Sequence, residues 1–478
     1  MKKSYFLVVL LFSLFSCSED SILDETPKEI PELTLKQAGD GVHDLLGFSY
    51  DATKEYLHVD AAPRTVLDID AFKRDHADRY YNPSSTIGNS ETYSGANATD
   101  MLEEIKTKNK VSANASYGLF GGSIKIENEL DVKQTFSTKY SYARQDVIKR
   151  TRRLYLDADL DMLLKYVKPV FYENLNNLTP DQFVASYGTH VLADITIGGR
   201  LSFLYRSTII EDNSSSRKKE IVEAGVKFGV GSFGADADNS HEKETIKSLN
   251  KKNSTWKMWV NYHGGERSGQ SFTYDSDKGL STSTFNPSDW EASVNNNNAA
   301  LVEINWDSAY PIYEFITDPV KKAQIKAAVE KYIASKKVDV IELFPLYEYW
   351  NAKDNDHYYT TEYGSTMGGG LWKYNNVVIG YIHKKSINGA SPLYEYWNAK
   401  DNDHYYTTEY GSTMGGGLWK YNGITGYIFK NKITGTTTLY EYWHAGLNDH
   451  YYTTEYGSTM GGGLWKYNGI TGYIYPVK

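Results

Sequence analysis

The segment Phe183-Val-Ala-Ser-Tyr-Gly-Thr-His-Val191 contains the motif Tyr187-Gly188-Thr189-His190, which is more informative about the fold than any other stretch of this chain. Thr179 and Pro180 precede it, and a threonine before a proline is typical of the capped first turn of a helix. We therefore expect the motif at the C-terminal end of a short helix. Taken alone, the motif fits both a turn beside a buried histidine and the signature of a fold, so the neighbouring segments must decide.

The composition excludes several classes of function. The chain has 478 residues, of which 40% are hydrophobic, and this length suits two or three domains with sizeable cores. The formal net charge is −9, so the chain has no overall basic field with which to bind nucleic acid or to lyse membranes by charge alone. We expect no nucleic-acid partner, and we expect any action on membranes to depend on shape.

The first 17 residues have the pattern of an export signal. Two lysines precede an apolar run over residues 5–15, which is too short to span a membrane as a helix, and Cys17 follows it. The segment 1–17 resembles a bacterial lipoprotein signal ending at a lipidated Cys17; an ordinary signal peptide is the alternative. Cys17 is the only cysteine, so no intramolecular disulfide is possible. The acidic start of the tether, 18–34, resembles a surface-export signal, which predicts an exported protein that is lipid-anchored in the outer membrane at the cell surface, or released from it.

Three tandem copies of one sequence fill the region 344–478. Residues 346–375 and 393–422 are identical, and residues 439–469 repeat the same text with few changes. Each copy contains four short strand-like pieces separated by Asn/Asp-rich and Gly-rich turns. Three such copies predict an all-β domain, which we interpret as a β-trefoil because threefold closure protects strand edges.

Each copy pairs a tryptophan with a histidine among polar residues, which predicts equivalent sites for a surface glycan. Aromatic faces beside hydrogen-bonding side chains suit sugars, and several weak sites on one domain raise avidity. The alternatives are that the aromatic residues fill the core, or that the copies are identical because the duplication is recent. One histidine and one carboxylate per copy fall short of a tetrahedral metal site, so we expect no metal and no cofactor. The residues predicted to bind glycan are Trp350, His357, Trp397, His404, Trp443 and His450.

Several segments around the opening motif form an ordered series. In chain order they are Leu46-Gly-Phe-Ser-Tyr-Asp51, Gly198-Gly199, Gly264-Gly265, Trp290, the segment 311–316 and an expected helix over 319–336. With Tyr187, Gly188, Thr189 and His190, they make the region 35–340 resemble a membrane-attack-complex/perforin (MACPF) domain. One departure is Val191, where the family often has an aromatic residue.

This resemblance implies an α+β fold in which a bent four-stranded antiparallel sheet is flanked by two helical clusters. Each cluster would unfurl into a β-hairpin that joins a ring-shaped transmembrane barrel. Gly198, Gly199, Gly264 and Gly265 would let the sheet bend, because glycine tolerates backbone conformations that other residues do not. The implied partners are a target-cell membrane and further copies of the chain in a ring, and Tyr187 to His190 would hold a helix end in place.

Two segments have the alternation that a membrane-spanning strand requires, with one face for lipid and one for water. They cover residues 111–136 and 222–239, before and after the opening motif. The alternative is a pair of half-buried hairpins that stay within the soluble protein, since alternation describes any amphipathic sheet. The predicted lipid-facing residues are Ile124, Ile126, Leu130, Val132, Phe136, Val226, Phe228 and Val230.

The sequence lacks the motifs of the common enzyme classes. It contains no Gly-x-Ser-x-Gly, no P-loop and no His-Glu-x-x-His, so we predict no catalytic residues. The resemblance extends to antimicrobial perforin-like proteins of gut Bacteroidales, which implies a pore-forming toxin whose C-terminal domain recognises a surface glycan or an outer-membrane receptor. The alternative is a non-lytic adhesin that uses a perforin-like scaffold, because a shared fold does not force a shared function.

Overall fold

The computed structural model describes residues 41–111, 135–210, 214–232, 252–253, 255–276, 287–336, 339–364, 371–411, 418–457 and 463–477. The predicted export signal with Cys17, the tether and most of the first predicted membrane segment lie outside these residues.

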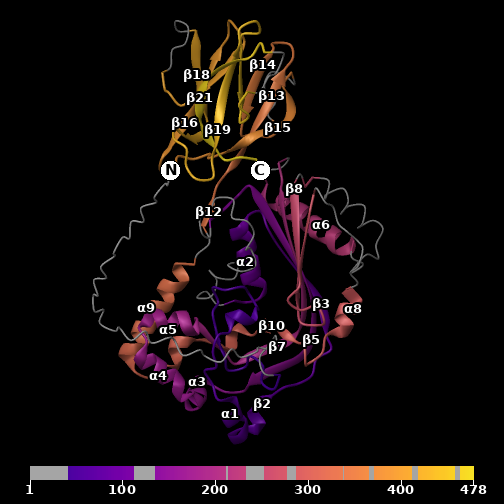
Figure 1. Cartoon of the computed structure of the whole chain (residues 1–478), viewed down its shortest axis with the longest axis vertical. Coiled ribbons are helices and arrows are strands. Elements are labelled where there is room, and N and C mark those ends of the chain that lie inside the picture. Colours follow the sequence, from indigo (N-terminus) through magenta and orange to yellow (C-terminus); the bar gives the residue numbers. More distant parts are fainter. Residues whose placement is uncertain are drawn as a thin grey trace, which may run out of the picture. The chain divides into compact units, whose positions relative to one another are not determined.

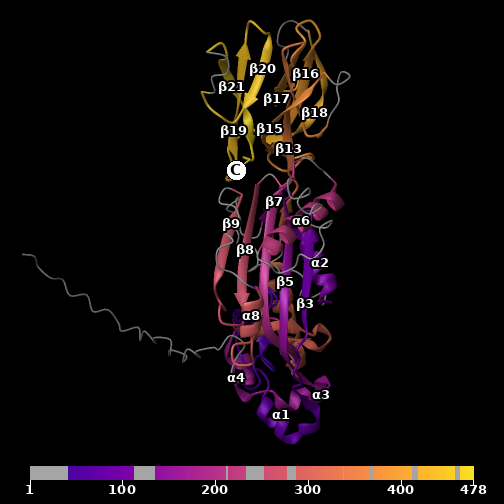
Figure 2. The ribbon, with the colours of Figure 1, turned by 90° about the vertical axis from the view of Figure 1, so that its right-hand side faces the viewer.

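A seven-stranded antiparallel sheet organises the region before residue 339. Strands β3, β5, β7, β8 and β9 lie side by side in that order (Figure 2). Four of them, β3, β5, β7 and β8, make the antiparallel four-stranded sheet that the resemblance implies. The strands are β2 (Tyr80–Tyr81), β3 (Gly88–Gly95), β5 (Tyr140–Leu156), β7 (Asp194–Thr208), β8 (Thr255–His263), β9 (Ser271–Asp275) and β10 (Ala300–Ile304).

The two faces of this sheet carry different side chains and different helices. Because side chains alternate along a strand, Phe203 and Tyr205 lie on one face, where they pack against α6 (Ser215–Ser232). Leu204 lies on the other face, in the cluster that includes α2 (Ala98–Lys108). The two helices therefore cover opposite faces of the sheet (Figure 1).

The middle of the sheet is a point of very close backbone contact. Along β7, the neighbouring strand changes from β10, which pairs with Gly198, to β8, which pairs with Arg200. A β-bulge between Arg150 and Arg152 in β5 lies opposite the same place, and bulges bend strands. A Cβ atom on Gly264 would lie 2.4 Å from the carbonyl oxygen of Gly198. The glycine pairs singled out in the sequence therefore meet where the strand partners change.

Trp290 covers this contact from α8 (Pro287–Ser293). Its indole Nε1 donates a hydrogen bond to the carbonyl oxygen of Gly264 at 3.0 Å. A Cβ atom on Gly199 would lie 2.8 Å from the Trp290 ring, and one on Gly265 would also lie 2.8 Å from it. All four predicted bend glycines and Trp290 thus form one packed unit.

A second, three-stranded sheet joins distant parts of the chain. Its order is β1 (Ser49–Tyr50), β6 (His190–Leu192) and β11 (Ala309–Pro311). As expected, Thr179 caps α5, forming a capping box with Gln182. The remaining helices are α1 (Ile69–Asp75), α3 (Leu160–Leu163), α4 (Pro169–Asn177), α5 (Pro180–Tyr187) and α9 (Pro319–Ala334), with 3₁₀ turns at Val59–Ala61, Ala77–Arg79, Leu164–Tyr166, Trp306–Ser308 and Ile312–Phe315.

The C-terminal repeats form three similar three-stranded antiparallel sheets. In each copy the first strand pairs with both others, and the two later sheets join through a contact between β18 and β21. Ahead of them, β12 (Asp339–Ile341) pairs in parallel with β4 (Thr135–Ser137). The strands are β13 (Phe344–Asn351), β14 (Asp356–Thr360), β15 (Lys373–Ile382), β16 (Ala390–Asn398), β17 (Asp403–Thr407), β18 (Trp419–Phe429), β19 (Thr437–His444), β20 (Asp449–Thr453) and β21 (Lys466–Ile474).

The all-β class of the repeat region is confirmed, whereas a trefoil is not. The sequence suggests four strands per copy, but the pieces expected at 371–374 and 380–382 belong to a single strand, β15. Irregularities in its pairing with β13 allow one strand to continue through residues that read as a turn. The described part of each copy therefore has three strands.

The close contact at Gly264 predicts a large effect of a single added methyl group. Gly264→Ala would combine a left-handed φ of +78° with the clash against Gly198. Gly269→Ala is a matched control, because Gly269 has a φ of +79° and open space around its Cβ position. We expect Gly269→Ala to lower the free energy of unfolding in urea by about 1–2 kcal/mol, and Gly264→Ala to lower it by at least about 2 kcal/mol more. Equal losses would show that the contact does not matter.

Candidate functional site

The Tyr187–His190 motif fastens the end of α5 to the segment around β1. The Gly188 N–H donates to the carbonyl of Val184 at 2.7 Å and so ends the helix. Gly188 has a φ of +77°, and a Cβ atom there would lie 2.7 Å from the backbone nitrogen of Asp51. Only glycine meets both conditions.

Thr189 makes the hydrogen bonds of this junction. Its backbone N–H donates to the Tyr50 carbonyl at 2.9 Å. Its Oγ1 accepts from the Ala52 N–H at 3.1 Å, and Thr189 is fully buried. The motif and the segment 46–51, two pieces that the sequence presents far apart, are therefore direct partners.

Tyr187 and His190 complete the junction as buried side chains. Tyr187 stacks on Phe183 with ring centroids 4.7 Å apart, and its hydroxyl accepts from Asn174 at 2.9 Å. Burial lowers the pKa of His190 to about 4, so the imidazole is neutral at physiological pH. The motif has a structural role, which agrees with the role that the resemblance implies.

Helix α6 lies on the apolar face of the sheet with glycines at the contact. Val222, Val226 and Val230, at intervals of four residues, are buried in one core with Tyr205 and Met258. A Cβ atom on Gly225 would lie 2.5 Å from the Tyr205 ring, and one on Gly229 would lie 2.6 Å from the Met258 sulfur. The helix therefore approaches the strands more closely than any residue with a side chain at these positions would permit.

Charged side chains are buried on the other face of the sheet. Arg144 pairs with Asp146 at 2.8 Å. Arg200 is 1% exposed, and its Nη2 donates to the Tyr56 carbonyl at 3.2 Å. Within the described part of the chain, its Nε and Nη1 atoms have no hydrogen-bond partner, and burial lowers the pKa of this arginine. The sequence analysis did not predict this buried cation beside the bend.

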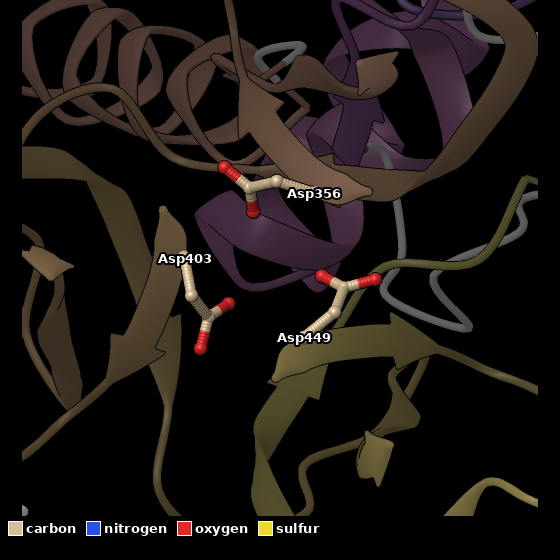
Figure 3. Close-up of side chains that lie close together, drawn as sticks. All are labelled: Asp356, Asp403 and Asp449. Atoms are coloured by element: carbon tan, nitrogen blue, oxygen red, sulfur yellow. The ribbon is translucent and has the colours of Figure 1, made fainter. Parts of the chain in front are cut away.

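Three aspartates meet on the pseudo-threefold axis of the repeats. Asp356, Asp403 and Asp449 begin the second strand of each copy, are fully buried, and point toward one another (Figure 3). One oxygen of each lies within 4.8 Å of the others. Each carboxylate also bonds the histidine of the next copy, with Nδ1 to oxygen distances of 2.6 Å for His404–Asp356, 2.7 Å for His450–Asp403 and 2.7 Å for His357–Asp449.

A second ring of bonds parallels the first. In each copy a backbone N–H donates to a tyrosine hydroxyl of another copy. The bonds run from Tyr359 to Tyr406 at 2.9 Å, from Tyr406 to Tyr452 at 2.8 Å, and from Tyr452 to Tyr359 at 2.9 Å. Both rings close only when three copies are present, so the number of repeats is fixed by the core.

Burial controls the protonation of Asp356 within this group of three aspartates, which we call the aspartate ring. It raises the pKa of Asp356 to about 9, with Asp403 and Asp449 adding to the shift. It lowers the pKa of His404, the partner of Asp356, to about 4. Both shifts favour uncharged groups, so the pair shares one proton between carboxylate and imidazole.

The aspartate ring is better explained as a structural contact between the copies than as a metal site. Within the described residues it is the one group of three acidic, histidine or cysteine side chains close enough to hold an ion. However, each aspartate uses one oxygen for the imidazole and the other for the backbone N–H of the same histidine, at 3.1–3.2 Å. The carboxylates are therefore engaged in joining the copies.

Comparison with models of known protein families identifies the region before the repeats. The model of the MAC/Perforin domain matches residues 50–342. The chain belongs to the MAC/Perforin family. The bent sheet, α6 and the Tyr187–His190 junction are thus parts of a perforin domain. A domain family of unknown function matches residues 326–415 and 345–475, which include the repeats.

Two solved structures share the fold, each with a TM-score of 0.50. A protein with a MAC/Perforin domain from Bacteroides thetaiotaomicron is 15% identical, and the match covers 79% of this chain and 70% of that chain. GNIP1Aa from Chromobacterium piscinae is 13% identical, with 84% and 74% covered. At this identity both show the fold alone. No curated protein matches the chain.

The predicted membrane segments of the perforin domain are placed only in part. Ile124, Ile126, Leu130 and Val132 lie outside the described residues, and Phe136 is half-buried in β4. Val226 and Val230 are buried in α6, and Phe228 is 37% exposed on it. The alternative of a soluble hairpin is therefore wrong for residues 222–232, which are helical. Within the described ranges, no helix has both the length and the apolar character needed to span a membrane.

The residues predicted to bind glycan form one tryptophan–histidine pair in each copy. Each tryptophan is half-buried against its own histidine, with ring centroids 4.5 Å apart for Trp350–His357 and 4.4 Å apart for Trp397–His404 and Trp443–His450. The histidines are buried in the aspartate ring. Sequence reasoning considered each Asp-His dipeptide within one copy and so missed that the aspartate serves the next copy.

The shared proton predicts a pH dependence of the repeat domain. Since the pKa of Asp356 is about 9 when folded and 3.8 when unfolded, its contribution to stability is fully present below pH 3.8 and is lost as the pH rises toward 9. Asp356→Asn removes this titration. We expect the variant to gain stability relative to wild type, by up to about 1.4 kcal/mol per pH unit across this window, in urea unfolding followed by tryptophan fluorescence.

The exposed Asp78 supplies the control for this comparison. Asp78→Asn removes the same charge and should follow the wild-type pH profile. Parallel profiles for Asp356→Asn and wild type would contradict the shared-proton account.

Proposed function

We propose that this protein is a pore-forming toxin of the perforin-like class that acts against related bacteria. The family membership supports the pore-forming part of this proposal. The observation that carries it is in α6, whose sequence satisfies two periodicities. As a helix it buries Val222, Val226 and Val230; as a strand it would place Val222, Ala224, Val226, Phe228 and Val230 on one face.

A soluble helix has no need for the second pattern. Phe228 belongs to this alternation although it is 37% exposed in the helix. In the proposed mechanism α6 leaves the sheet, and the segment 222–239 inserts as a hairpin together with 111–136. Beside the glycine contacts at Tyr205 and Met258, two polar contacts would have to break: the hydrogen bond from the Ser94 hydroxyl of β3 to Glu223 at 2.6 Å and the ion pair of Lys219 with Glu104 of α2 at 3.7 Å.

The proposed route of the protein to its target is based on the segment 1–17 and on the repeats at 344–478. We propose that the export signal 1–17 leads to a lipid anchor at Cys17 in the outer membrane, from which the protein acts at the cell surface or after release. The threefold repeat domain would recognise a surface glycan or an outer-membrane receptor on the target. Copies bound side by side would then form a ring on the target-cell membrane.

The alternative is a non-lytic adhesin, favoured by the near-identity of the three repeats. The two functions differ in one assay. Purified protein spanning residues 18–478 is added to a panel of related strains, and growth and entry of a membrane-impermeant dye are followed. The toxin predicts dye entry and growth arrest in at least one strain that binds the protein. Binding without dye entry in every strain would favour the adhesin.

Single cysteines in α6 test insertion directly, because the helix and the strand place the same residues differently. In the helix Val226 is buried, whereas Lys227 and Phe228 are exposed. After insertion, a dye sensitive to its surroundings should report lipid from Val226→Cys and from Phe228→Cys, and water from Lys227→Cys. Protein spanning residues 18–478 lacks Cys17, the one native cysteine, so each introduced thiol is the only one. If Phe228→Cys reports water on permeabilised cells, the segment does not insert as a strand.

A further inference from the structure

Each repeat also carries three tyrosines whose rings contact one another. Ring centroids are 5.2 to 6.1 Å apart in the second copy and 5.2 to 6.3 Å apart in the third. The contacts hold the rings in place, so the tyrosine side chains would lose little freedom when a ligand binds. We name the groups cluster one (Tyr347, Tyr363, Tyr374), cluster two (Tyr394, Tyr410, Tyr421) and cluster three (Tyr440, Tyr456, Tyr467).

Clusters two and three are open, whereas cluster one is partly covered. Tyr410 and Tyr456 are both 71% exposed, but the equivalent Tyr363 is only 39% exposed. Tyr347 is fully buried, and its hydroxyl donates a hydrogen bond to the carbonyl of Ile210. Ile210 itself packs against the core of the repeats. Two of the three equivalent surfaces are therefore available to an outside partner.

The covered cluster shows what such a surface contacts. At cluster one a tyrosine hydroxyl binds a carbonyl oxygen and an aliphatic side chain packs alongside. In the open clusters, Tyr394 faces Ile424 across the strands and Tyr440 faces Ile470, and these isoleucines are 44% and 50% exposed. No hydroxyl of clusters two and three has a hydrogen-bond partner within the described residues. Each open cluster thus offers apolar ring faces edged by unused hydroxyls.

A sugar ring matches this combination. Its C–H face packs on aromatic and aliphatic surface, and its hydroxyl groups exchange hydrogen bonds with tyrosine hydroxyls. A stable protein interface needs about 20–30 residues on each side, far more than a group of three rings supplies. Tyrosine gives rigid amphipathic contact at low entropy cost, which suits a small polar ligand. We propose that clusters two and three are two equivalent binding sites for a carbohydrate chain.

This inference rests on the proposed recognition of a surface glycan and changes both its residues and its valency. It assigns binding to tyrosines in place of the tryptophan–histidine pairs, whose histidines are buried, and it sets the number of sites at two. Because both sites belong to one rigid domain, a polysaccharide with a repeating unit would engage them together. The second contact then adds avidity without a new type of contact.

Substitutions at the most exposed rings test the sites without disturbing the core. The probe is polysaccharide extracted from a strain that binds the full chain, fixed to a sensor surface. Tyr410→Ala and Tyr456→Ala should each weaken apparent binding about tenfold to a hundredfold, and the double variant should not bind. Tyr363→Ala, at the covered cluster, is the matched control and should bind like wild type. An unchanged melting temperature confirms that each variant folds.

Two control experiments test whether the ligand is a lipid or a protein instead of a carbohydrate. Vesicles of lipids from the same strain, free of polysaccharide, should not bind wild-type protein, and protease treatment of intact cells should not reduce binding. Wild-type-like binding of the double variant to polysaccharide, binding to the bare vesicles instead of the polysaccharide, or loss of binding after protease would each overturn the inference.

The dye-entry assay on the same strain allows the binding sites and the proposed toxin function to fail separately. Tyrosine-dependent polysaccharide binding without dye entry in any strain would reject the toxin and retain the sites. Dye entry by wild type together with full polysaccharide binding by the double variant would reject the sites and retain the toxin.

Discussion

The bend of the perforin sheet depends on two backbones that touch where only glycine fits. The 2.4 Å separation expected between a Cβ on Gly264 and the Gly198 oxygen leaves no room for another side chain. Trp290 closes the contact by packing on Gly199 and bonding the Gly264 carbonyl. Beyond the bend, β7 continues between β5 and β8 and supplies the face on which α6 rests. The position of the helix therefore follows from the geometry at the glycines.

The two regions of the chain are held by different kinds of interaction. In the perforin domain α6 lies against the strands mainly through valines and glycines, together with one hydrogen bond from the Ser94 hydroxyl of β3 to Glu223. In the repeats, the aspartate–histidine and tyrosine rings tie each copy to the next by directional bonds inside a buried core, where an unpaired group is costly. We infer that the first region is built to rearrange and the second to keep its shape while it binds.

The sequence predicted those features that depend on local backbone chemistry. The motif at 187–190, the glycine pairs and Trp290 could be recognised because each position admits few residue types. The residue pattern of 222–232 did not by itself decide the state of the segment, since valines spaced by four fit a helix and apolar residues spaced by two fit a strand; packing on Tyr205 decides for the helix. The strand count of the repeats failed because β15 continues through an irregular pairing. The role of Asp356 was hidden because its partner, His404, belongs to another copy.

The central claim, that this perforin domain makes a pore, is tested most directly by electrical recording. Purified protein spanning residues 18–478 is added to a planar bilayer that contains outer-membrane extract from a strain to which it binds. The account predicts discrete, long-lived conductance steps that depend on the extract. Strong binding to the extract with no conductance, over protein concentrations that saturate the binding, would contradict it.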